Sequence, residues 1–434
     1  MVSLKVISSD DVTEENIKNY IPRTSTELDS IREPVNKIIN KVKFEGDQAI
    51  IELTKKFDGI DLDKTEIKVS KEEIGEAYDS IDKKLIDALK YAKKNLIKFH
   101  KAQKREDWSI EIENGVNAGQ IYRPLDSVGI YIPGGRAIYP STVLMAATPA
   151  YVAGVKKIII CSPPQKDKKI APEILVAAKE FEIDKIYKVG GAQAIAAMTF
   201  GTDTIPAVQK VVGPGNKWVN VAKQLLSTKI AIDTPAGPSE ILIIADAFDN
   251  HKYVTIDLIS QIEHDPENIG ILVSDSSELI DKVNDNIESY VEKSERKDII
   301  KIALKNNSLA IKAKDLEDCV RISNIIAPEH LQIFTKNPKE VLKSIKNAGA
   351  IFLGEYSPVP LGDYSAGTNH ILPTGGNAKK YSGLNVFNFL KIIDVLECND
   401  EGLKALSHSA ITIAQFEGLY AHKKSIEERL KDKN

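Results

Sequence analysis

The sequence predicts an α/β protein with two Rossmann-like open α/β sheet domains and additional helical segments at both ends of the chain. Two observations lead to this prediction. Four short apolar segments alternate with helical stretches between residues 128 and 212, and a second block of the same kind spans residues 240–312. Short apolar strands that alternate with helices are typical of βαβ units on a parallel sheet.

The pattern also places the individual elements in order along the chain. Apolar residues at helical spacing predict helices over 34–57 and 71–104. The first sheet should contain strands at 128–132, 157–161, 185–189 and 210–212. The second sheet should contain strands at 240–244, 269–273 and 308–312, with one helix ending at His264 and another starting at Ser277. Helical character returns after residue 377 and covers 402–431.

Composition excludes several classes of protein. The 434 residues are enough for two or three domains with a well-buried core. The formal charge is only -4 and opposite charges are interleaved, so neither nucleic acid nor a membrane is expected as a partner. The three cysteines stand singly, as expected for core residues in a reducing cytosol, and the N-terminal residues lack an apolar signal segment. We therefore expect a cytoplasmic protein.

Glycine-rich turns follow three strands of the first block. They are Ile130-Tyr131-Ile132-Pro133-Gly134-Gly135-Arg136, Gly190-Gly191-Ala192-Gln193 and Gly213-Pro214-Gly215-Asn216. None matches G-x-G-x-x-G, and each alone could be an ordinary tight turn. Together they would lie at the carboxyl edge of one sheet, where open α/β sheets bind ligands, which favours a cofactor groove.

Two residues that could bind a metal ion stand close together near the middle of the chain. Gln261 and His264 stand three residues apart in Ser-Gln-Ile-Glu-His, which would place both on one face of a helix. A capped, hydrogen-bonded pair is the alternative explanation for this spacing. Further polar candidates follow at Asp363, in a glycine-containing loop, and at His370, Glu417 and His422. Imidazole nitrogen combined with amide or carboxylate oxygen suits zinc better than calcium or magnesium.

An acid and a base stand side by side in Ala-Pro-Glu-His-Leu. Pro328 can occupy the first turn of a helix, which would leave Glu329 and His330 at its positive end. We then expect Glu329 to be ionised and His330 to be neutral at pH 7, a pair suited to a reaction with several proton transfers. A capping glutamate beside a surface histidine is the alternative.

Taken together, these segments resemble the histidinol dehydrogenase family over essentially the whole chain. The resemblance rests on these motifs: Tyr-Ile-Pro-Gly-Gly, Gly-Gly-Ala-Gln-Ala-Ile-Ala-Ala, Gly-Pro-Gly-Asn, Ala-Gly-Pro-Ser-Glu, Ser-Gln-Ile-Glu-His, Ala-Pro-Glu-His-Leu, Gly-Asp-Tyr-Ser-Ala-Gly-Thr-Asn-His-Ile-Leu-Pro-Thr and Glu-Gly-Leu-Tyr-Ala-His.

The resemblance implies a role for each candidate residue. It implies that zinc is held by Gln261, His264, Asp363 and His422, and that Glu329 and His330 are catalytic. It implies that NAD is bound by Tyr131, Gln193 and Asn216. The residues that it places around the substrate are Ser239, Gln261, His264, His330, Asp363, His370, Glu417 and His422.

The reaction that the resemblance implies is the oxidation of L-histidinol to L-histidine through an aldehyde, with two successive hydride transfers to NAD. Zinc cannot accept electrons, so its implied role is to bind and orient the substrate. The resemblance also implies a domain-swapped homodimer in which each site is shared between two chains. A zinc hydrolase, a dehydrogenase of another small alcohol with the same fold, and a purely structural protein are the alternatives.

The same resemblance implies the domain boundaries. A helical segment at 1–24 is expected to pack with the C-terminal appendage. Residues 25–131 and 239–384 would form the domain that carries the metal and catalytic residues, and residues 132–238 would form the NAD-binding domain. Residues 385–434 would form a helical, domain-swapped appendage for dimerisation.

Overall fold

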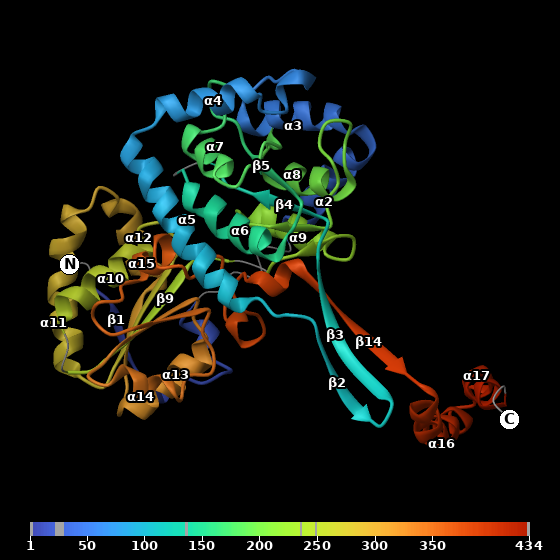
Figure 1. Ribbon diagram of the computed structural model, residues 1–434. Coiled ribbons are helices and arrows are strands. Elements are labelled where there is room, and N and C mark those ends of the chain that lie inside the picture. Colours follow the sequence, from blue (N-terminus) through green and yellow to red (C-terminus); the bar gives the residue numbers. More distant parts are fainter. Residues whose placement is uncertain (1–2, 22–29, 135–137, 235–236, 248–249, 432–434) are drawn as a thin grey trace.

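The computed structural model describes residues 3–21, 30–134, 138–234, 237–247 and 250–431. It contains two parallel sheets, each covered by helices, and an antiparallel arm that extends away from both (Figure 1). The predicted α/β fold class is therefore confirmed. Gly135 and Arg136 of the first glycine-rich turn, and Ala236 of the Ala-Gly-Pro-Ser-Glu motif, lie outside the described residues.

The five-stranded sheet contains all four strands predicted for the first block. Its order is β6 (Ile186–Lys188), β5 (Lys157–Ser162), β4 (Ser127–Tyr131), β7 (Lys210–Val212) and β8 (Ala231–Ile232), and all its pairings are parallel. Its strands are mostly buried because helices cover both faces, which explains the continuous apolar runs in the sequence. These helices include α6 (Pro140–Ala153), α7 (Pro172–Lys179), α8 (Gly191–Phe200) and α9 (Lys217–Leu226).

The helices of the N-terminal region pack on this same sheet. α4 (Lys71–Ser80) and α5 (Lys83–Gln103) share a hydrophobic core with α6 and α7, while α2 (Arg32–Glu45) and α3 (Asp47–Asp58) share one with α8 and α9. The structure thus differs from the boundary that grouped residues 25–131 with the catalytic domain. Apolar faces of helices show that they are buried, but they do not show which sheet buries them.

The six-stranded sheet forms the second α/β unit and is parallel throughout. Its order is β1 (Lys5–Ser8), β11 (Leu309–Lys312), β10 (Ile269–Ser274), β9 (Glu240–Ala245), β12 (His330–Phe334) and β13 (Ala350–Leu353). One face packs against α10 (His251–Ile262), α11 (Ser277–Lys293) and α12 (Lys297–Asn307), and the other against α13 (Leu316–Ile326) and α14 (Pro338–Leu342).

Two predictions about this region are wrong. Residues 3–21 do not form an α-helical segment, because β1 pairs in register with β11 as an edge strand of the six-stranded sheet and only short 3₁₀ helices follow it. Glu329 and His330 do not begin a helix either. Helix α13 ends at Ile326, Ala327 adopts a left-handed conformation with φ 52°, and His330 is the first residue of strand β12.

The arm consists of an antiparallel three-stranded sheet and two terminal helices. The strand order is β14 (Leu390–Cys398), β3 (Val116–Pro124) and β2 (Trp108–Glu113), followed along the chain by α16 (Asp400–Phe416) and α17 (Tyr420–Lys431). In Figure 1 this arm leads away from the two parallel sheets and ends in the two helices and the C-terminus. The predicted all-helical appendage at 385–434 therefore begins instead with a 3₁₀ turn and a strand.

Short helices complete the chain, and no helix in the described part is long and apolar enough to span a membrane. The remaining elements are the α-helix α15 (Val359–Tyr364) and the 3₁₀ helices η1 (Ser9–Asp11), η2 (Ile17–Asn19), η3 (Lys64–Glu66), η4 (Asn377–Lys379) and η5 (Val386–Phe389).

Candidate functional site

The polar candidates of the six-stranded sheet gather at the amino ends of two neighbouring strands, β9 and β12. Ser239 precedes β9, and Glu329 directly precedes β12, which begins with His330. The register pairs His330 with Ile241, so the starts of the two strands lie side by side. Both Glu329 and His330 are buried, with exposed fractions of 4% and 2%.

Backbone groups of Glu240 orient both members of the Glu329–His330 pair. The N–H of Glu240 donates a hydrogen bond to Oε2 of Glu329 at 2.9 Å. Nδ1 of His330 lies 3.2 Å from the carbonyl oxygen of Glu240. Because a carbonyl can only accept, Nδ1 carries a hydrogen, and the lone pair of the neutral imidazole is on Nε2.

The second ring nitrogen of His330, Nε2, faces Asp363. Nε2 lies 3.5 Å from Oδ1 of Asp363, beyond the usual hydrogen-bond distance, and this buried nitrogen has no hydrogen-bond partner among the described residues. A buried nitrogen without a partner is costly in a folded protein, and such atoms often mark a place where a substrate binds. In its neutral form, His330 is therefore suited to remove a proton from a ligand held beside Asp363.

The protonation states of Glu329 and His330 differ from those that the sequence predicted, because burial and neighbouring charges change the pKa of both groups. Burial raises the pKa of Glu329 to about 7, although the neighbouring His330 acts in the opposite direction. Burial alone would lower the pKa of His330, but the carboxylates of Glu329 and Asp363 raise it to about 9. The prediction of an ionised Glu329 beside a neutral His330 is wrong for the chain by itself, because it assumed a helix N-terminus that is absent.

The first two metal candidates lie at the end of α10. Gln261 is in the last turn of this helix and is buried, whereas His264 lies two residues beyond it and is half-buried. Asn268 connects this segment to Ser239, because its side chain donates to the carbonyl oxygen of Gln261 at 2.9 Å and accepts from the N–H of Ser239 at 3.2 Å. His264 and Asp363 influence each other's pKa through their charges, which places them in one site.

Asp363 and His370 complete this part of the site. Asp363 belongs to the short helix α15 rather than to a loop. Nδ1 of His370 donates to the backbone carbonyl of Asp363 at 3.0 Å, and its Nε2 lies 3.3 Å from Oγ1 of Thr142. Since Thr142 belongs to α6 on the five-stranded sheet, His370 connects the two α/β units at the site.

Glu417 and His422 are not brought to this site within one chain. Glu417 follows α16 and His422 lies on α17, both at the tip of the arm and exposed to solvent. Figure 1 shows these helices far from β9 and α10. Accordingly, no three His, Cys, Asp or Glu side chains are grouped as a metal site in the part of the single chain that the structure describes.

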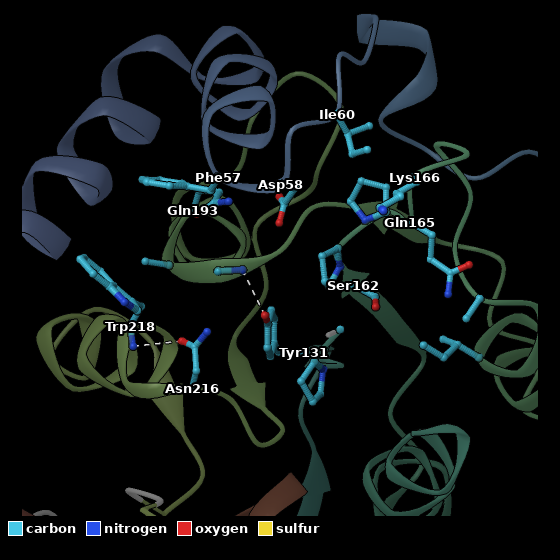
Figure 2. A pocket seen from close by; sticks show the side chains of 18 of the residues that line it. Phe57, Asp58, Ile60, Tyr131, Ser162, Gln165, Lys166, Gln193, Asn216 and Trp218 are labelled. Carbon is cyan, nitrogen blue, oxygen red and sulfur yellow. Dashed lines mark hydrogen bonds between the residues drawn. The ribbon is translucent and has the colours of Figure 1, made fainter. Parts of the chain in front are cut away.

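A separate cavity of about 930 Å³ lies at the carboxyl ends of the strands of the five-stranded sheet. Its lining includes Tyr131, Gln193 and Asn216, the three residues predicted to bind NAD (Figure 2). The hydroxyl of Tyr131 accepts from the N–H of Gly191 at 3.1 Å. Oδ1 of Asn216 caps α9 by accepting from Trp218 N at 3.0 Å and Val219 N at 3.2 Å, which leaves the amide nitrogen of Asn216 available for a ligand.

Comparison with known proteins identifies the family. The family model for histidinol dehydrogenase matches residues 21–430. The chain belongs to the histidinol dehydrogenase family. It is 47% identical to the histidinol dehydrogenase of Methanocaldococcus jannaschii, over 97% of each chain, and 49% identical to that of Clostridium acetobutylicum, over 96% of each chain. The crystal structure of histidinol dehydrogenase from Elizabethkingia anophelis matches with a TM-score of 0.95 and 39% identity, covering 100% of this chain and 99% of that one.

Membership of the histidinol dehydrogenase family is consistent with zinc and NAD as cofactors. The residues present in this chain fit both groups. Amide oxygen, imidazole nitrogen and carboxylate oxygen of Gln261, His264 and Asp363 form a donor set of the kind that zinc accepts. The cavity around Tyr131 combines apolar walls with a few polar groups, as expected for a dinucleotide site.

The sequence did not indicate several residues that position the side chains of the candidate site. Glu240, Asn268 and Thr142 hold Glu329, His330, Ser239 and His370 through the contacts described above. Glu240 lies in the Pro-Ser-Glu motif, so a signal for it was present. The functional group that Glu240 uses toward Glu329 and His330 is its backbone, which no side-chain pattern reveals.

Proposed function

We propose that this chain oxidises L-histidinol to L-histidine at the site formed by Gln261, His264, Glu329, His330 and Asp363. The reaction consumes L-histidinol, two NAD⁺ and one water, and it yields the L-histidine carboxylate, two NADH and three protons. The buried Nε2 of His330, which has no hydrogen-bond partner among the described residues and lies 3.5 Å from Oδ1 of Asp363, is the observation that supports this most strongly. It provides a base beside the residues that would hold zinc.

Four residues would hold the metal in this proposal. Gln261, His264 and Asp363 come from the body of one subunit, and the fourth would be His422 of the partner subunit. Bound zinc would supply a fixed positive centre that binds the imidazole and amino nitrogens of the substrate and so orients its alcohol carbon. Ser239 and His370, together with Glu417 of the partner subunit, would contact the substrate.

His330 would act as the base in both oxidation steps. Its Nδ1–H remains on the carbonyl of Glu240, so Nε2 can accept the alcohol proton of histidinol and later the hydroxyl proton of the aldehyde hydrate. The fixed hydrogen bond keeps the ring in one orientation during both proton transfers. This residue therefore needs no rearrangement between the steps.

Glu329 would activate the water that adds to the aldehyde. Its carboxyl is oriented by the N–H of Glu240, and a pKa raised to about 7 by burial places it in the range of an effective general base at neutral pH. Between the two oxidation steps the aldehyde would remain in the buried site, which limits its side reactions.

The proposed assembly is a homodimer in which arms are exchanged. Large apolar side chains are exposed on the arm of the single chain, including Ile110 (54%), Leu396 (67%) and Phe416 (88%). Apolar patches of this kind commonly mark protein–protein interfaces. A second copy of the chain would cover them and would bring its Glu417 and His422 to the site of the first chain.

We also propose the cytoplasm as the location of this enzyme. All three cysteines are free thiols, and two of them, Cys161 and Cys319, are buried. Burial raises the pKa of the Cys319 thiol to about 12, so this side chain behaves as an unreactive core residue. Free thiols and the use of NAD as oxidant both suit a reducing compartment.

An assay of the zinc-loaded enzyme with L-histidinol and NAD tests the proposal. Two NADH should form for each histidinol consumed, with histidine as the product. A metal hydrolase would consume no NAD. A dehydrogenase for a different alcohol would reduce NAD only with that alcohol, so an absence of NADH with histidinol would contradict the proposal.

Removal of the metal is the second test. A chelator should abolish histidinol oxidation, and added zinc, manganese or cobalt should restore it. Metal content by elemental analysis is the necessary control, because a metal-free preparation that turns over normally would show that the assigned ligands are wrong. His264→Asn should bind zinc more weakly while its circular dichroism spectrum stays unchanged.

A further inference from the structure

An acidic side chain lies in the cofactor cavity where no function has been assigned to it. Asp58 is the last residue of α3, and the helix ends there because Gly59 adopts a left-handed conformation with φ 72°. Asp58 lines the 930 Å³ cavity together with Phe57, Tyr131 and Gln193. Figure 2 shows its carboxylate extending from the helix end into the space above Tyr131.

The Asp58 carboxylate has no partner among the described residues. No hydrogen bond or ion pair engages it, and surrounding protein alone raises its pKa to about 6. Its charge also contributes to the raised pKa of Tyr131, which confirms that the two groups are close. A titratable group that is perturbed in this way inside a cleft is a candidate for ligand binding.

The position of Asp58 is unfavourable for the fold by itself. A negative charge at the C-terminus of a helix is repelled by the last carbonyl groups, and the protein around the exposed Asp58 adds a desolvation cost. Neighbouring Asp61 is exposed as well, but it differs from Asp58 because it forms a 2.8 Å ion pair with Lys55. A ligand that donates hydrogen bonds would offset the costs at Asp58.

The chemistry of the cavity indicates which part of a dinucleotide Asp58 contacts. An ionised carboxylate only accepts hydrogen bonds, so it binds hydroxyl groups and repels phosphates. The two hydroxyls of a ribose form a diol that can donate to both carboxylate oxygens. The walls beside it, from Phe57, Pro133, Pro163 and Trp218, provide apolar faces against which a flat base can pack.

The place of α3 in the fold distinguishes the two riboses of NAD. α3 packs within the core of the five-stranded sheet, with α2, α8 and α9, and the residues of the six-stranded sheet are absent from this core. The nicotinamide end of the cofactor must reach the substrate beside His330, at the six-stranded sheet. The end near Asp58 is therefore the adenosine end.

We propose that Asp58 binds the hydroxyl groups of the adenosine ribose of NAD and thereby excludes NADP. This inference rests on the proposed function. The 2′-phosphate of NADP would replace one of these hydroxyls by a group with about two negative charges, directly beside a carboxylate. Asp58 is thus a specificity-determining residue for the cofactor and takes no part in the hydride or proton transfers.

The test compares cofactor preference in the zinc-loaded enzyme and in Asp58→Asn, which keeps the shape of the side chain but removes its charge. KM for NAD should rise about tenfold or more, as expected for the loss of a charged hydrogen bond, while KM for NADP should fall. The ratio of kcat/KM for NAD to that for NADP should then decrease at least tenfold. KM for histidinol and kcat at saturating NAD should change little.

Two further variants and a direct binding measurement separate specificity from folding. Asp58→Glu retains the charge and should keep the preference for NAD, and Asp61→Asn removes a charge three residues away and should have no effect. NADH fluorescence titration, with NADPH as competitor, should reproduce the same order without turnover. If Asp58→Asn fails to fold, a loss of NAD preference in the charge-retaining Asp58→Glu would overturn the inference.

The outcomes distinguish this inference from the proposed function. If the wild-type enzyme oxidises histidinol with NAD and Asp58→Asn prefers NAD as strongly as before, Asp58 has no role in specificity and the proposed function remains. If the wild-type enzyme neither binds NADH nor reduces NAD with histidinol, the proposed function fails and the inference fails with it.

Discussion

At the residue scale, Glu329 and His330 divide the two half-reactions between them. Water must be activated only after the aldehyde has formed, so Glu329→Gln should affect the second oxidation most. We expect oxidation of added histidinal to drop by about 10²-fold or more, while some NADH still forms in the first turnover with histidinol. His330→Asn should impair both steps. Equal losses of Glu329→Gln on alcohol and aldehyde would refute this division of labour.

A buried ion pair beside the glycine-rich turn at residues 213–216 gives a second prediction at this scale. Lys223 and Asp233 form a salt bridge with side-chain exposures of 2% and 4%, and both hold Gly213. Lys223 donates to its carbonyl at 2.9 Å, and Asp233 accepts from its N–H at 2.7 Å. Asp233→Asn would leave a buried ammonium group without its counter-charge, so we expect a loss of about 3–5 kcal/mol in the free energy of unfolding.

Urea denaturation of the zinc-loaded enzyme measures this effect. The double variant Asp233→Asn, Lys223→Met removes the orphaned charge as well and should recover much of the loss. A single variant as stable as the wild type would show that solvent reaches Lys223. The same cycle of variants gives the coupling energy of the pair.

The individual site residues could be proposed from the sequence mainly because motifs carry their identities. In the structure the charges of His264, Glu329, His330 and Asp363 influence one another, and Asn268 connects Gln261 to Ser239 beside them. Their protonation was not predictable, since it depends on burial and on neighbours distant in sequence. Pro328 was interpreted as a helix start, but the left-handed Ala327 ends α13 and leads the chain directly into a strand.

At the scale of elements, one glycine separates two helices that the sequence predicted as a single helix over 34–57. Gly46 has φ 55° and ψ −128°, a conformation that only glycine adopts easily, and it lies between α2 and α3. An added Cβ would meet nothing closer than 3.9 Å, so only the backbone resists substitution. Gly46→Ala should therefore destabilise the protein by about 1–3 kcal/mol.

Thermal unfolding measures the effect of Gly46→Ala, with Gly75→Ala in α4 as the matched control. Gly75 lies within a helix and has open space around the position of a Cβ, so alanine should stabilise it slightly. Equal melting temperatures for the two variants would contradict the role given to the Gly46 backbone.

Seven strands of the two parallel sheets, β4 to β7 and β9 to β11, were predictable because helices bury them on both faces and require continuous apolar runs, whereas β1, β8, β12 and β13 were not predicted. The arm strands were missed. β2 does alternate apolar Trp108, Ile110 and Ile112 with polar residues, which is a strand signal, but it is exposed throughout in the single chain. β2 pairs with β3, and the other neighbour of β3 is β14, which lies far along the chain at residues 390–398, so the sequence shows neither this pairing nor the position of the arm.

At the scale of the whole molecule, the proposed shared site predicts complementation between inactive chains. Asp363→Ala lacks a ligand in the body, and His422→Ala lacks one in the arm. When both are unfolded and refolded together, half of the random dimers should be mixed, and each of these should contain one intact site. About a quarter of wild-type activity should return. Each variant refolded alone is the control, and a mixture without activity would place both ligands in one chain.

The organisation of the molecule was less predictable than its elements. The sequence indicates two α/β units, but the helices at 32–103 and strand β1 were assigned to different neighbours from those that the structure shows. Packing partners depend on the shapes of whole surfaces, which a single sequence does not display. The cofactor cavity lies at the carboxyl ends of one sheet and Glu329 and His330 at the amino ends of the other, so the two units must face each other for catalysis.

The position of Glu417 and His422 at the tip of a long arm has a consequence for inheritance. In the proposed dimer, a gene with a defect in the arm and a gene with a defect in the body each encode an enzyme that lacks activity. A cell that carries both genes would assemble some mixed dimers and could grow without added histidine. Two mutant alleles of one gene would then behave, in a cross, as if they belonged to two different genes.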